Sequence, residues 1–376
     1  MKCPLCEKEC SLILQIKDYP VFANAVEGPL EEDNLYSFSV SFCNVCAFGF
    51  QHNPPAPEEL YTRVRAPSGV SKVWQDHYQA LIRFTFHNSS HHGKSALDVG
   101  AGHGFLSRLL LEESINAEAI DLNPGERLLS LGIPVHQQSF GVESALEKQY
   151  DFLFISHVIE HVNTLNEFLN FADSVLAPDG QIIFSIPDSL AGLETKDLSM
   201  FIPEHTWYFS ERSLEKIFIP KGLEIEEIGF FSNHSIFARV RRKSGGQKNW
   251  QERASLKELS FLSEKYCAEY SQATSQTENI IHESKGRVLF FGAHSMTLNL
   301  IVDKKPWKDL NKSFLLIDND PFKQGKRLSG TPLKIISPEK ANLSEGDTVI
   351  IPKSPYAEEM EKQVLGMKNG LSVTII

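Results

Sequence analysis

Residues 96–105 constrain the fold of this chain more than any other stretch of similar length. An apolar run ends in Asp98, glycines follow at alternate positions (Gly100, Gly102 and Gly104), and a helix-forming segment comes next. This order predicts a buried strand, a tight loop and the first turn of a helix. Backbone N–H groups at such a turn can approach a ligand closely. The stretch therefore predicts a ligand-binding loop.

Two ligand classes compete for this loop. A dinucleotide fingerprint requires Gly-x-Gly-x-x-Gly, whereas the third glycine here comes one residue early, directly before Phe105. An acid just before Gly-x-Gly-x-Gly instead suits S-adenosylmethionine (SAM), because the carboxylate can hold the ammonium of its methionine end. In this respect the stretch resembles motif I of the class I SAM-dependent methyltransferases. The residues expected to contact SAM here are Asp98, Gly100, Ala101, Gly102 and Gly104.

Strands alternate with helices from this loop onward. Strands are expected over residues 95–99, 117–121, 152–156 and 181–186, and helices over residues 105–113, 124–131 and 164–176. A further helix is expected ahead of the loop, over residues 72–86. This alternation implies right-handed crossovers and a parallel, doubly wound sheet. Residues 178–180, Pro-Asp-Gly, predict a turn before the last of these strands. The predicted fold class is α/β, with a doubly wound sheet of the class I methyltransferase type.

Three further residues are expected to contact the cofactor. Asp121 ends the second strand, about 20 residues beyond the glycine loop, where a carboxylate can accept both ribose hydroxyls of an adenosyl group. A helix N-cap ahead of Pro124 is the competing interpretation of Asp121. Phe140 is expected to contact the adenine, and His157, directly after the strand at residues 152–156, is expected to line the same site.

The segment that follows the strand at residues 152–156 carries candidate chemistry. His157, Glu160 and His161 form the order His-x-x-Glu-His at the carboxyl end of a strand, where ligands of open α/β sheets bind. The common zinc-protease motif is His-Glu-x-x-His, and the reversed order occurs in another protease class, so a metal is the weaker interpretation here. A general acid/base or substrate-facing role of His161 fits the position better.

A second ionisable pair, Glu204 and His205, lies within an aromatic run that ends at Ser210. Such a pair can hold the pKa of an imidazole near neutrality, which a proton-abstracting base requires. The competing interpretation is a surface pair ahead of a helix that Ser210 caps.

Two Cys-x-x-Cys pairs enclose strand-like alternation over residues 11–16 and 36–42. Four thiolates in this arrangement are the ligand set of a closed, structural zinc site. Unpaired cysteines in a small β module are the competing interpretation, and Cys10 is an alternative ligand with a less suitable spacing. The expected zinc ligands are Cys3, Cys6, Cys43 and Cys46.

Charge and hydropathy limit the partners and the location. The 376 residues carry a formal net charge of −11 without a long basic run, which argues against nucleic acid as the main partner. No apolar segment approaches the ~20 residues of a membrane span, and the N-terminus lacks the apolar region of a secretory signal. Six cysteines in such a chain indicate reduced thiols or metal ligands, so a cytoplasmic location is expected. The oligomeric state is left open.

A polar linker at residues 243–249 precedes a second α/β unit. A helix is expected within residues 251–282, and a small parallel sheet from strands at residues 287–292, 314–318, 347–351 and 371–376. Lys323 and Lys326, in a polar segment after one of these strands, can receive the phosphates of an anionic substrate, with an exposed turn as the alternative. The expected domains are a zinc-binding module (1–70), a SAM-binding core (71–245) and a Rossmann-like substrate domain (246–376).

In this order the features resemble the nucleotide-sugar C-methyltransferases. The resemblance rests on the cysteine pairs, the glycine loop, the segment Glu204-His205-Thr206-Trp207-Tyr208-Phe209-Ser210 and the segment 318–335, and it covers nearly the whole chain. It implies that SAM methylates a ring carbon beside the keto group of a deoxysugar linked to a nucleoside diphosphate. A base removes the proton from that carbon, and the enolate attacks the methyl group.

The same resemblance assigns roles to three residues. His205 is the expected base, Glu204 orients it, and His161 is the polar partner of the oxyanion. The chain departs from the family in the substrate site, because Ile202 and Pro203 stand where a tyrosine and a histidine are usual. Alternatives are therefore methylation of another small molecule, including O-methylation, and a diverged SAM-binding protein without turnover.

Overall fold

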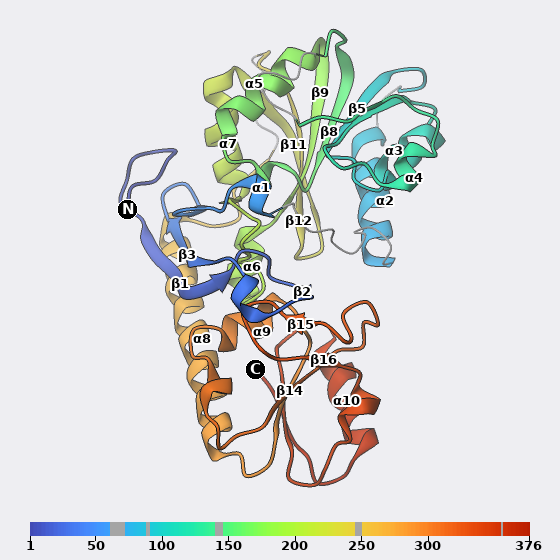
Figure 1. Cartoon of the computed structure of the whole chain (residues 1–376). Coiled ribbons are helices and arrows are strands. Elements are labelled where there is room, and N and C mark those ends of the chain that lie inside the picture. The colour runs from blue at the N-terminus through green and yellow to red at the C-terminus, as the bar shows by residue number, and fades with distance from the viewer. Residues whose placement is uncertain (61–71, 88–90, 140–145, 245–249, 355) are drawn as a thin grey trace.

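The computed structural model describes residues 1–60, 72–87, 91–139, 146–244, 250–354 and 356–376. These residues form sheets of four, seven and five strands and one two-stranded ribbon. In Figure 1 the seven-stranded sheet lies at the top, the five-stranded sheet at the bottom, and the N-terminal strands lie between them at the left. Within the described part of the chain, every helix is too short or too polar to cross a membrane.

The central unit is a seven-stranded sheet in the order β11-β12-β9-β8-β5-β6-β7. Its strands are β5 (Ser95–Val99), β6 (Asn116–Ile120), β7 (Val135–His136), β8 (Tyr150–Ser156), β9 (Leu176–Pro187), β11 (Leu223–Phe231) and β12 (Ser235–Arg242). Its helices are α2 (Lys72–Phe86), α3 (Phe105–Glu112), α4 (Glu126–Leu129), α5 (Leu165–Val175), α6 (Ser189–Thr195) and α7 (Glu211–Phe218). The predicted α/β class is confirmed, and the predicted strands and helices agree with these elements to within a few residues, except at α4 and the start of β9.

The strands of this sheet do not all run in one direction. Strands β5 to β9 are parallel, as predicted, but β12 is antiparallel to β9 and β11 is antiparallel to β12. Only residues 232–234 join β11 to β12. That connection suffices for a hairpin, whereas parallel neighbours need a crossover of a dozen residues or more.

The predicted turn at residues 178–180 lies inside β9. The pairing of β9 with β8 shifts at this point, since Tyr150 pairs with Leu176 but Phe152 pairs with Gln181. Three extra residues on β9 therefore form a bulge, which explains why the Pro-Asp-Gly signal did not end the strand.

The N-terminal strands connect the other two units. Strands β1 (Ser11–Pro20), β3 (Leu35–Cys43) and β4 (Phe48–Gln51) form an antiparallel sheet whose fourth strand is β10 (Trp207–Tyr208), from the central part of the chain. The ribbon pairs β2 (Ala25–Val26) with β15 (Arg327–Leu328) of the C-terminal part. A short helix, α1 (Pro57–Leu60), follows β4. The predicted strands at residues 11–16 and 36–42 are confirmed.

The C-terminal unit is the predicted parallel sheet, in the order β16-β14-β13-β17-β18. Its strands are β13 (Val288–Phe291), β14 (Phe314–Ile317), β16 (Ile335–Ile336), β17 (Thr348–Ile351) and β18 (Ser372–Ile375). Its helices are α8 (Leu256–Glu283), α9 (Ser295–Ile301) and α10 (Ala357–Met367). A capping box of Ser255 and Glu258 starts α8.

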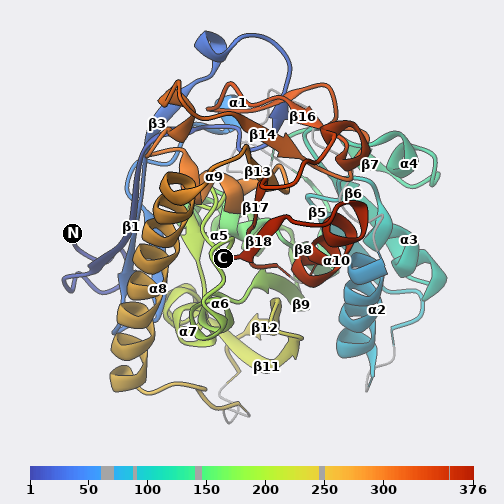
Figure 2. The same ribbon diagram turned by 90° about the horizontal axis from the view of Figure 1, so that it is seen from below.

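Helix α8 fastens the C-terminal unit to the N-terminal strands. Figure 2 shows α8 beside β1, and the thiol of Cys267 lies 3.5 Å from the carbonyl oxygen of Ile13. A single apolar cluster contains Phe38 of β3 together with Leu298 of α9 and Ile350 of β17. The N-terminal sheet therefore shares a core with the C-terminal unit.

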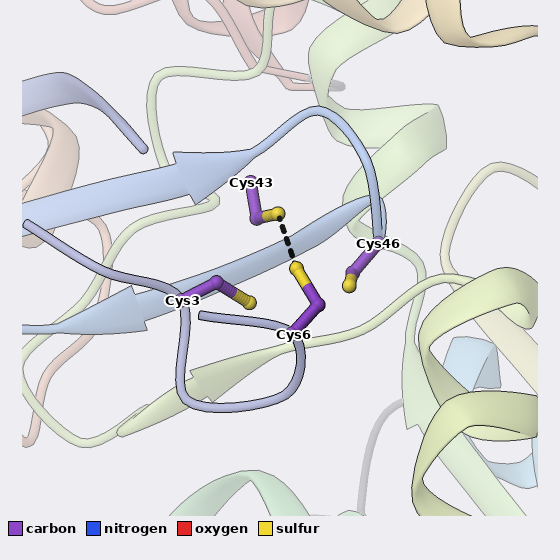
Figure 3. A group of neighbouring side chains, drawn as sticks. All are labelled: Cys3, Cys6, Cys43 and Cys46. Atoms are coloured by element: carbon purple, nitrogen blue, oxygen red, sulfur yellow. Dashed lines mark hydrogen bonds between the residues drawn. The ribbon is translucent and has the colours of Figure 1, made fainter. Parts of the chain in front are cut away.

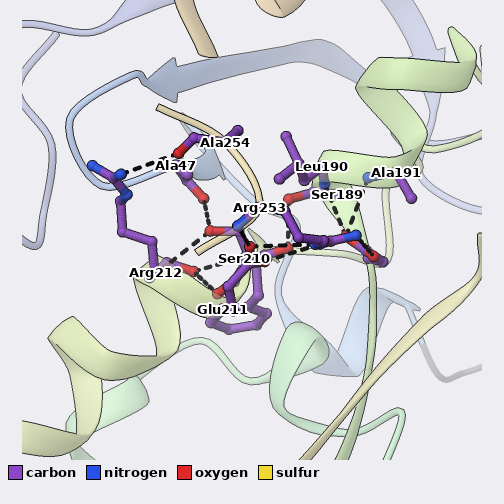
Figure 4. A network of polar contacts seen from close by, with 12 residues as sticks. Ala47, Ser189, Leu190, Ala191, Ser210, Glu211, Arg212, Arg253 and Ala254 are labelled. Carbon is purple, nitrogen blue, oxygen red and sulfur yellow. Dashed lines mark hydrogen bonds and ion pairs between the residues drawn. The ribbon is translucent and has the colours of Figure 1, made fainter. Parts of the chain in front are cut away.

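A polar network holds the start of α8 to the central sheet (Figure 4). The guanidinium of Arg253 donates to Asp188 at 2.8 Å and to Glu211 at 2.9 Å, and both carboxylates are almost fully buried. The hydroxyl of Ser210, which caps α7, donates to the carbonyl oxygen of Ala47 at 2.8 Å. The predicted domain boundaries at 70/71 and 245/246 fall outside the described residues, and the three domains stay a prediction.

Candidate functional site

The predicted cofactor loop joins β5 to α3 at the carboxyl edge of the sheet. Gly100 and Gly104 have φ angles of +70° and +74°, a conformation that favours glycine. A Cβ on Gly100 would lie 2.5 Å from Val158, and one on Gly104 would lie 2.9 Å from the Cα of Leu128. Glycine is therefore required at both positions by the backbone angle and by close packing.

The acid that precedes the loop lies beneath it. Asp98 is 2% exposed, and its Oδ2 accepts a hydrogen bond from the hydroxyl of Ser107 in α3 at 2.6 Å. Burial raises the pKa of Asp98 to about 7, with a smaller contribution from Asp121, although the Ser107 hydrogen bond opposes the shift. A cationic group of a ligand at this loop would favour the ionised carboxylate.

Asp121 closes the loop from the neighbouring strand. Its Oδ2 accepts the N–H of Gly102 at 2.7 Å, and its Oδ1 accepts the N–H of Asn123 at 2.7 Å. The competing N-cap interpretation is wrong, because α4 begins at Glu126 with Gly125 at its N-cap position. The N–H of Ala101 points toward the carbonyl oxygen of Ile120 at 3.5 Å. Phe140 lies outside the described residues.

His157 lies at the end of β8 among aromatic rings. Its φ of +55° turns the chain sharply, and its Nε2 is 3.2 Å from the hydroxyl of Ser235. Its ring packs edge-on against Trp74, with 4.9 Å between ring centroids, and against His77, with 5.3 Å between centroids. Desolvation lowers the pKa of His77 to about 2, so this ring is neutral. A contact between His157 and a cofactor stays a prediction.

The sequence analysis did not select Trp74 and His77, although they lie on the helix predicted at residues 72–86. A signal was present, since Trp74, His77, Tyr78 and Leu81 follow the spacing of one helix face. That spacing is equally typical of a helix face that packs on the core. Only the contacts of Trp74 and His77 with His157, after β8, distinguish a face near the candidate site from an ordinary core face.

The predicted chemical residues come together after β8. His161 ends a short 3-10 helix, Ile159–His161, and its ring centroid is 4.8 Å from that of His205. Nδ1 of His161 is 2.8 Å from the carbonyl oxygen of Glu204. Glu204 is only 3% exposed, so the alternative of a surface pair is wrong, although Ser210 does cap α7 as that interpretation required.

Glu160 had a role only in the weaker metal interpretation of the sequence. Its carboxylate is completely buried, and its Oε1 lies 3.2 Å from Nδ1 of His157 and 3.9 Å from Nε2 of His161. Burial acts to raise the pKa of Glu160, but the neighbouring imidazoles, His157 foremost, together lower it to about 2. The ligand atoms of Glu160, His161 and His205 all lie within 4.8 Å of one another.

The four predicted zinc ligands also come together. Figure 3 shows Cys3 and Cys6 of the N-terminal loop pointing toward Cys43 and Cys46 of the turn between β3 and β4. Their sulfur atoms lie within 4.8 Å of one another, with 3.6 Å between those of Cys6 and Cys43. Two thiolates on one tetrahedral zinc ion are about 3.7 Å apart. The donor set and its spacing fit zinc, and Cys10 is not part of the group.

The C-terminal unit has its own loop after a strand. The N–H of Ala293 donates to Oδ2 of Asp318 at 2.7 Å. The ammonium of Lys323 donates to the carbonyl oxygen of Ala293 at 3.0 Å and lies 3.3 Å from Oδ2 of Asp318. Lys323, expected to bind phosphate, is thus held by its own chain, whereas Lys326 is partly exposed beside it.

Comparison with known families finds a similarity in the central unit. Residues 73–228 match the family described as a methyltransferase domain. This range includes the glycine loop and most of the seven-stranded sheet, so the central part of the chain is similar to a methyltransferase domain.

Relatives of known name match the same part. The mitochondrial ubiquinone biosynthesis O-methyltransferase of Rattus norvegicus is 26% identical over 190 residues, covering 44% of this chain and 52% of the relative. The ubiquinone biosynthesis O-methyltransferase of Photorhabdus laumondii is 30% identical over 102 residues, covering 25% of this chain and 42% of the relative. The chain thus spans about half the length, or less, of the relatives it matches.

Solved structures match at low identity. One is the 1,6-didemethyltoxoflavin-N1-methyltransferase of Burkholderia thailandensis with bound S-adenosylhomocysteine, which is 15% identical. The match covers 52% of this chain and 96% of that one, with a TM-score of 0.36.

Proposed function

We propose that this chain is a SAM-dependent methyltransferase that methylates a carbon beside the keto group of a nucleotide-linked sugar. One observation carries the proposal: the predicted cofactor loop and the ionisable cluster meet at the same edge of the sheet. Strands β5 and β8 are neighbours, and Gly100 of the loop packs against Val158, two residues before Glu160. A methyl donor in the loop would therefore lie beside His161 and His205.

The nucleotide-linked acceptor is supported by the C-terminal unit and by the sequence resemblance. In the five-stranded parallel sheet, strand β14 is followed by a polar segment that contains Lys326. An ammonium group at the carboxyl edge of a parallel sheet suits the phosphates of a nucleoside diphosphate. In this proposal Lys326 contacts the phosphates, and Lys323 supports the loop.

The ionisable cluster supplies the acid–base chemistry. In this proposal no metal ion is bound to the ring of His205. His205 takes the proton from the carbon beside the keto group, and Glu204 orients the ring of His205. His161 faces the oxygen that becomes negative in the enolate. The pair Asp98 and Asp121 holds the methionine end and the ribose of SAM at the neighbouring strands.

The cysteine cluster is proposed to hold one structural zinc ion. Four thiolates leave no open position on a tetrahedral ion, so this site stabilises the N-terminal strands and takes no part in the chemistry. Metal analysis of the purified protein should find about one zinc per chain. A Cys43→Ser variant should lose that zinc, and a zinc-free wild-type protein would contradict the assignment.

O-methylation is the second candidate, and the relatives favour it. The matched proteins from Rattus norvegicus and Photorhabdus laumondii are both named O-methyltransferases. In an O-methylation the acceptor loses a hydroxyl proton, which is more acidic than a C–H. The demand on His205 as a base is then smaller.

Product analysis tests both candidates. The protein is mixed with SAM labelled with carbon-13 in its methyl group and with a panel of keto-deoxysugar nucleotides, and release of S-adenosylhomocysteine is measured. The chemical shift of the labelled methyl group in the product distinguishes attachment to carbon from attachment to oxygen. Asp98→Ala is the matched control, and absence of turnover with every acceptor while SAM still binds would sink the sugar proposal.

A further inference from the structure

The cluster of Glu160, His161 and His205 has the composition of a metal site that is distinct from the four cysteines. We propose that these three residues bind one divalent transition-metal ion beside the cofactor loop. Two imidazoles and one carboxylate leave open positions on such an ion. The weak metal interpretation of the sequence used His157 with Glu160 and His161, whereas the fold brings in His205 from a segment 44 residues further along.

The ring of His161 is fixed in the orientation that a metal ligand needs. A carbonyl oxygen only accepts hydrogen bonds, so the 2.8 Å contact from Nδ1 to the carbonyl of Glu204 assigns the proton to Nδ1. The lone pair then lies on Nε2, the nitrogen that faces Glu160 at 3.9 Å. Ligating histidines characteristically donate their other N–H in this way.

Glu160 supplies a buried negative charge with unused acceptor capacity. The side chain is completely buried, and neither carboxylate oxygen accepts a hydrogen bond from the described residues. Nδ1 of His157 lies 3.2 Å from Oε1, and Oε2 has no hydrogen-bond partner among the described residues, so Oε2 can face an ion. A buried carboxylate is stabilised by a cation or by coordination to a metal, and otherwise its burial is costly.

The backbone around the cluster is firmly held. The N–H of Thr206 donates to the carbonyl oxygen of Glu160 at 2.8 Å, which joins the segment of His205 to the 3-10 helix. The side-chain amide of Gln51, from β4, donates to the carbonyl oxygens of His205 at 2.6 Å and of Pro203 at 2.8 Å. Ligands on rigid segments need little rearrangement to close around an ion, which here must draw them together slightly.

The donor types select the metal. Two imidazole nitrogens favour Fe(II), Co(II) or Zn(II), and the carboxylate also suits Mn(II), while Mg(II) and Ca(II) prefer sites made of oxygen ligands. An ion here would take an oxygen of the methyl acceptor at an open position and make the adjacent proton more acidic. This consequence rests on the proposed methyl transfer, but metal binding itself does not. A liganded His205 no longer serves as the base, so the two descriptions of this residue exclude one another.

Mn(II) binding tests the site without any acceptor. Mn(II) avoids thiolates, so protein that metal analysis shows to carry only one zinc ion per chain, at its cysteines, is titrated with Mn(II), and the loss of the free-ion signal is followed by electron paramagnetic resonance. One site per chain is expected, with affinity reduced at least about 100-fold in Glu160→Gln and in His205→Gln. His136→Gln is the matched control, because His136 is not a member of the cluster. Its Nε2 lies 3.0 Å from the carboxylate of Glu118.

Two results would overturn the proposal: no Mn(II) site in the zinc-loaded protein, or a site that persists in both ligand variants. Glu160→Gln alters a buried residue and can disturb folding, whereas the partly exposed His205 is the safer position. SAM affinity and the thermal midpoint, measured on each variant, separate misfolding from loss of the ion. A failure of the metal proposal leaves SAM binding and turnover unchanged, so it is distinguishable from a failure of the proposed function.

Discussion

Two loops of this molecule make the same turn after a parallel strand, one after β5 and the other after β13. In each, an acid at the end of the next strand binds a loop N–H: Asp121 accepts from Gly102 and Asp318 accepts from Ala293, both at 2.7 Å. Each loop also begins with a glycine. Its N–H donates a hydrogen bond, 2.8 Å long, to the carbonyl oxygen of the last residue of that next strand. The same backbone framework is thus present twice.

The two loops differ in what fills them. The first loop is packed at its first glycine, where a Cβ on Gly100 would lie 2.5 Å from Val158, but it is open at Gly102, where no described atom lies within 4 Å of the position of a Cβ. In the second, a Cβ on Gly292 would lie 2.6 Å from the ring of His294, and Lys323 contacts Asp318. Loop geometry alone therefore does not specify a ligand site, because the side chains around it decide whether a ligand can enter.

Removing the acid beneath the open loop should have the largest effect. Asp98→Ala takes away the proposed partner of the SAM ammonium, and loss of one partner of a buried charge pair weakens binding by about 4 kcal/mol, or about 1000-fold. Asp98→Asn keeps an acceptor for Ser107 and serves to separate charge from structure. Calorimetric titration with SAM measures both variants, and wild-type affinity in either would refute the cofactor loop.

The same residue predicts how stability depends on pH. The pKa of Asp98 is about 7 in the folded chain, against an ordinary value of 3.8, so between these values the folded state binds more protons than the unfolded state. Stability without SAM should therefore fall as pH rises from about 4 to 7, by roughly 4 kcal/mol, and stay low above 7. Urea unfolding at a series of pH values measures this change in the free energy of unfolding.

Asp98→Asn is the control for this pH dependence. The variant should lack that fall and be more stable than the wild type at pH 8. SAM should act in the opposite direction, because its ammonium favours the ionised carboxylate, so its affinity for the wild type should rise between pH 5 and pH 8. Identical pH profiles for the two proteins would contradict the buried, protonated state of Asp98.

The filled loop should respond to pH with the opposite sign. Burial, and to a lesser degree Lys323, lowers the pKa of His294 from 6.5 to about 4. The folded state then binds fewer protons than the unfolded state between these values, so stability should be lost as pH falls through this range, by roughly 3 kcal/mol.

His294→Asn tests this assignment with little change to the helix start. The ring Nδ1 accepts the N–H of Met296 as the N-cap of α9, and an asparagine oxygen can do the same. The variant should lose the acid-dependent fall in the free energy of unfolding, even if the smaller side chain lowers stability at pH 7. If the free energy of unfolding of the variant fell with pH in the same way as that of the wild type, a group other than His294 would be responsible.

The sequence predicted what depends on neighbouring residues. Strand β5 and helix α2 have the predicted ends, and the glycine loop, the acid at its edge and the paired cysteines follow local spacing. The positions of these motifs in the fold were therefore predictable from the sequence.

Features that depend on distant residues were not predictable. Strand β10 pairs with β4, more than 150 residues away, and two-residue strands carry no periodic signal. Glu160 and His205 meet only because the fold joins their segments, and Lys323 closes a loop that begins 31 residues before it. Such contacts follow from packing of the units and leave no pattern in the sequence.

Replacing the two lysines of the C-terminal segment should give the smallest effects and divide their roles. Lys323→Met removes a partly exposed ion pair with Asp318, so the free energy of unfolding should fall by about 1 kcal/mol. Lys326→Met should leave stability unchanged and weaken binding of a nucleoside diphosphate about tenfold, as expected for one ammonium–phosphate contact. Urea unfolding and calorimetric titration with a nucleoside diphosphate measure the two effects. If Lys323→Met instead abolished diphosphate binding without loss of stability, the filled loop would itself be the phosphate site, and the contrast between the two loops would be smaller than their side chains indicate.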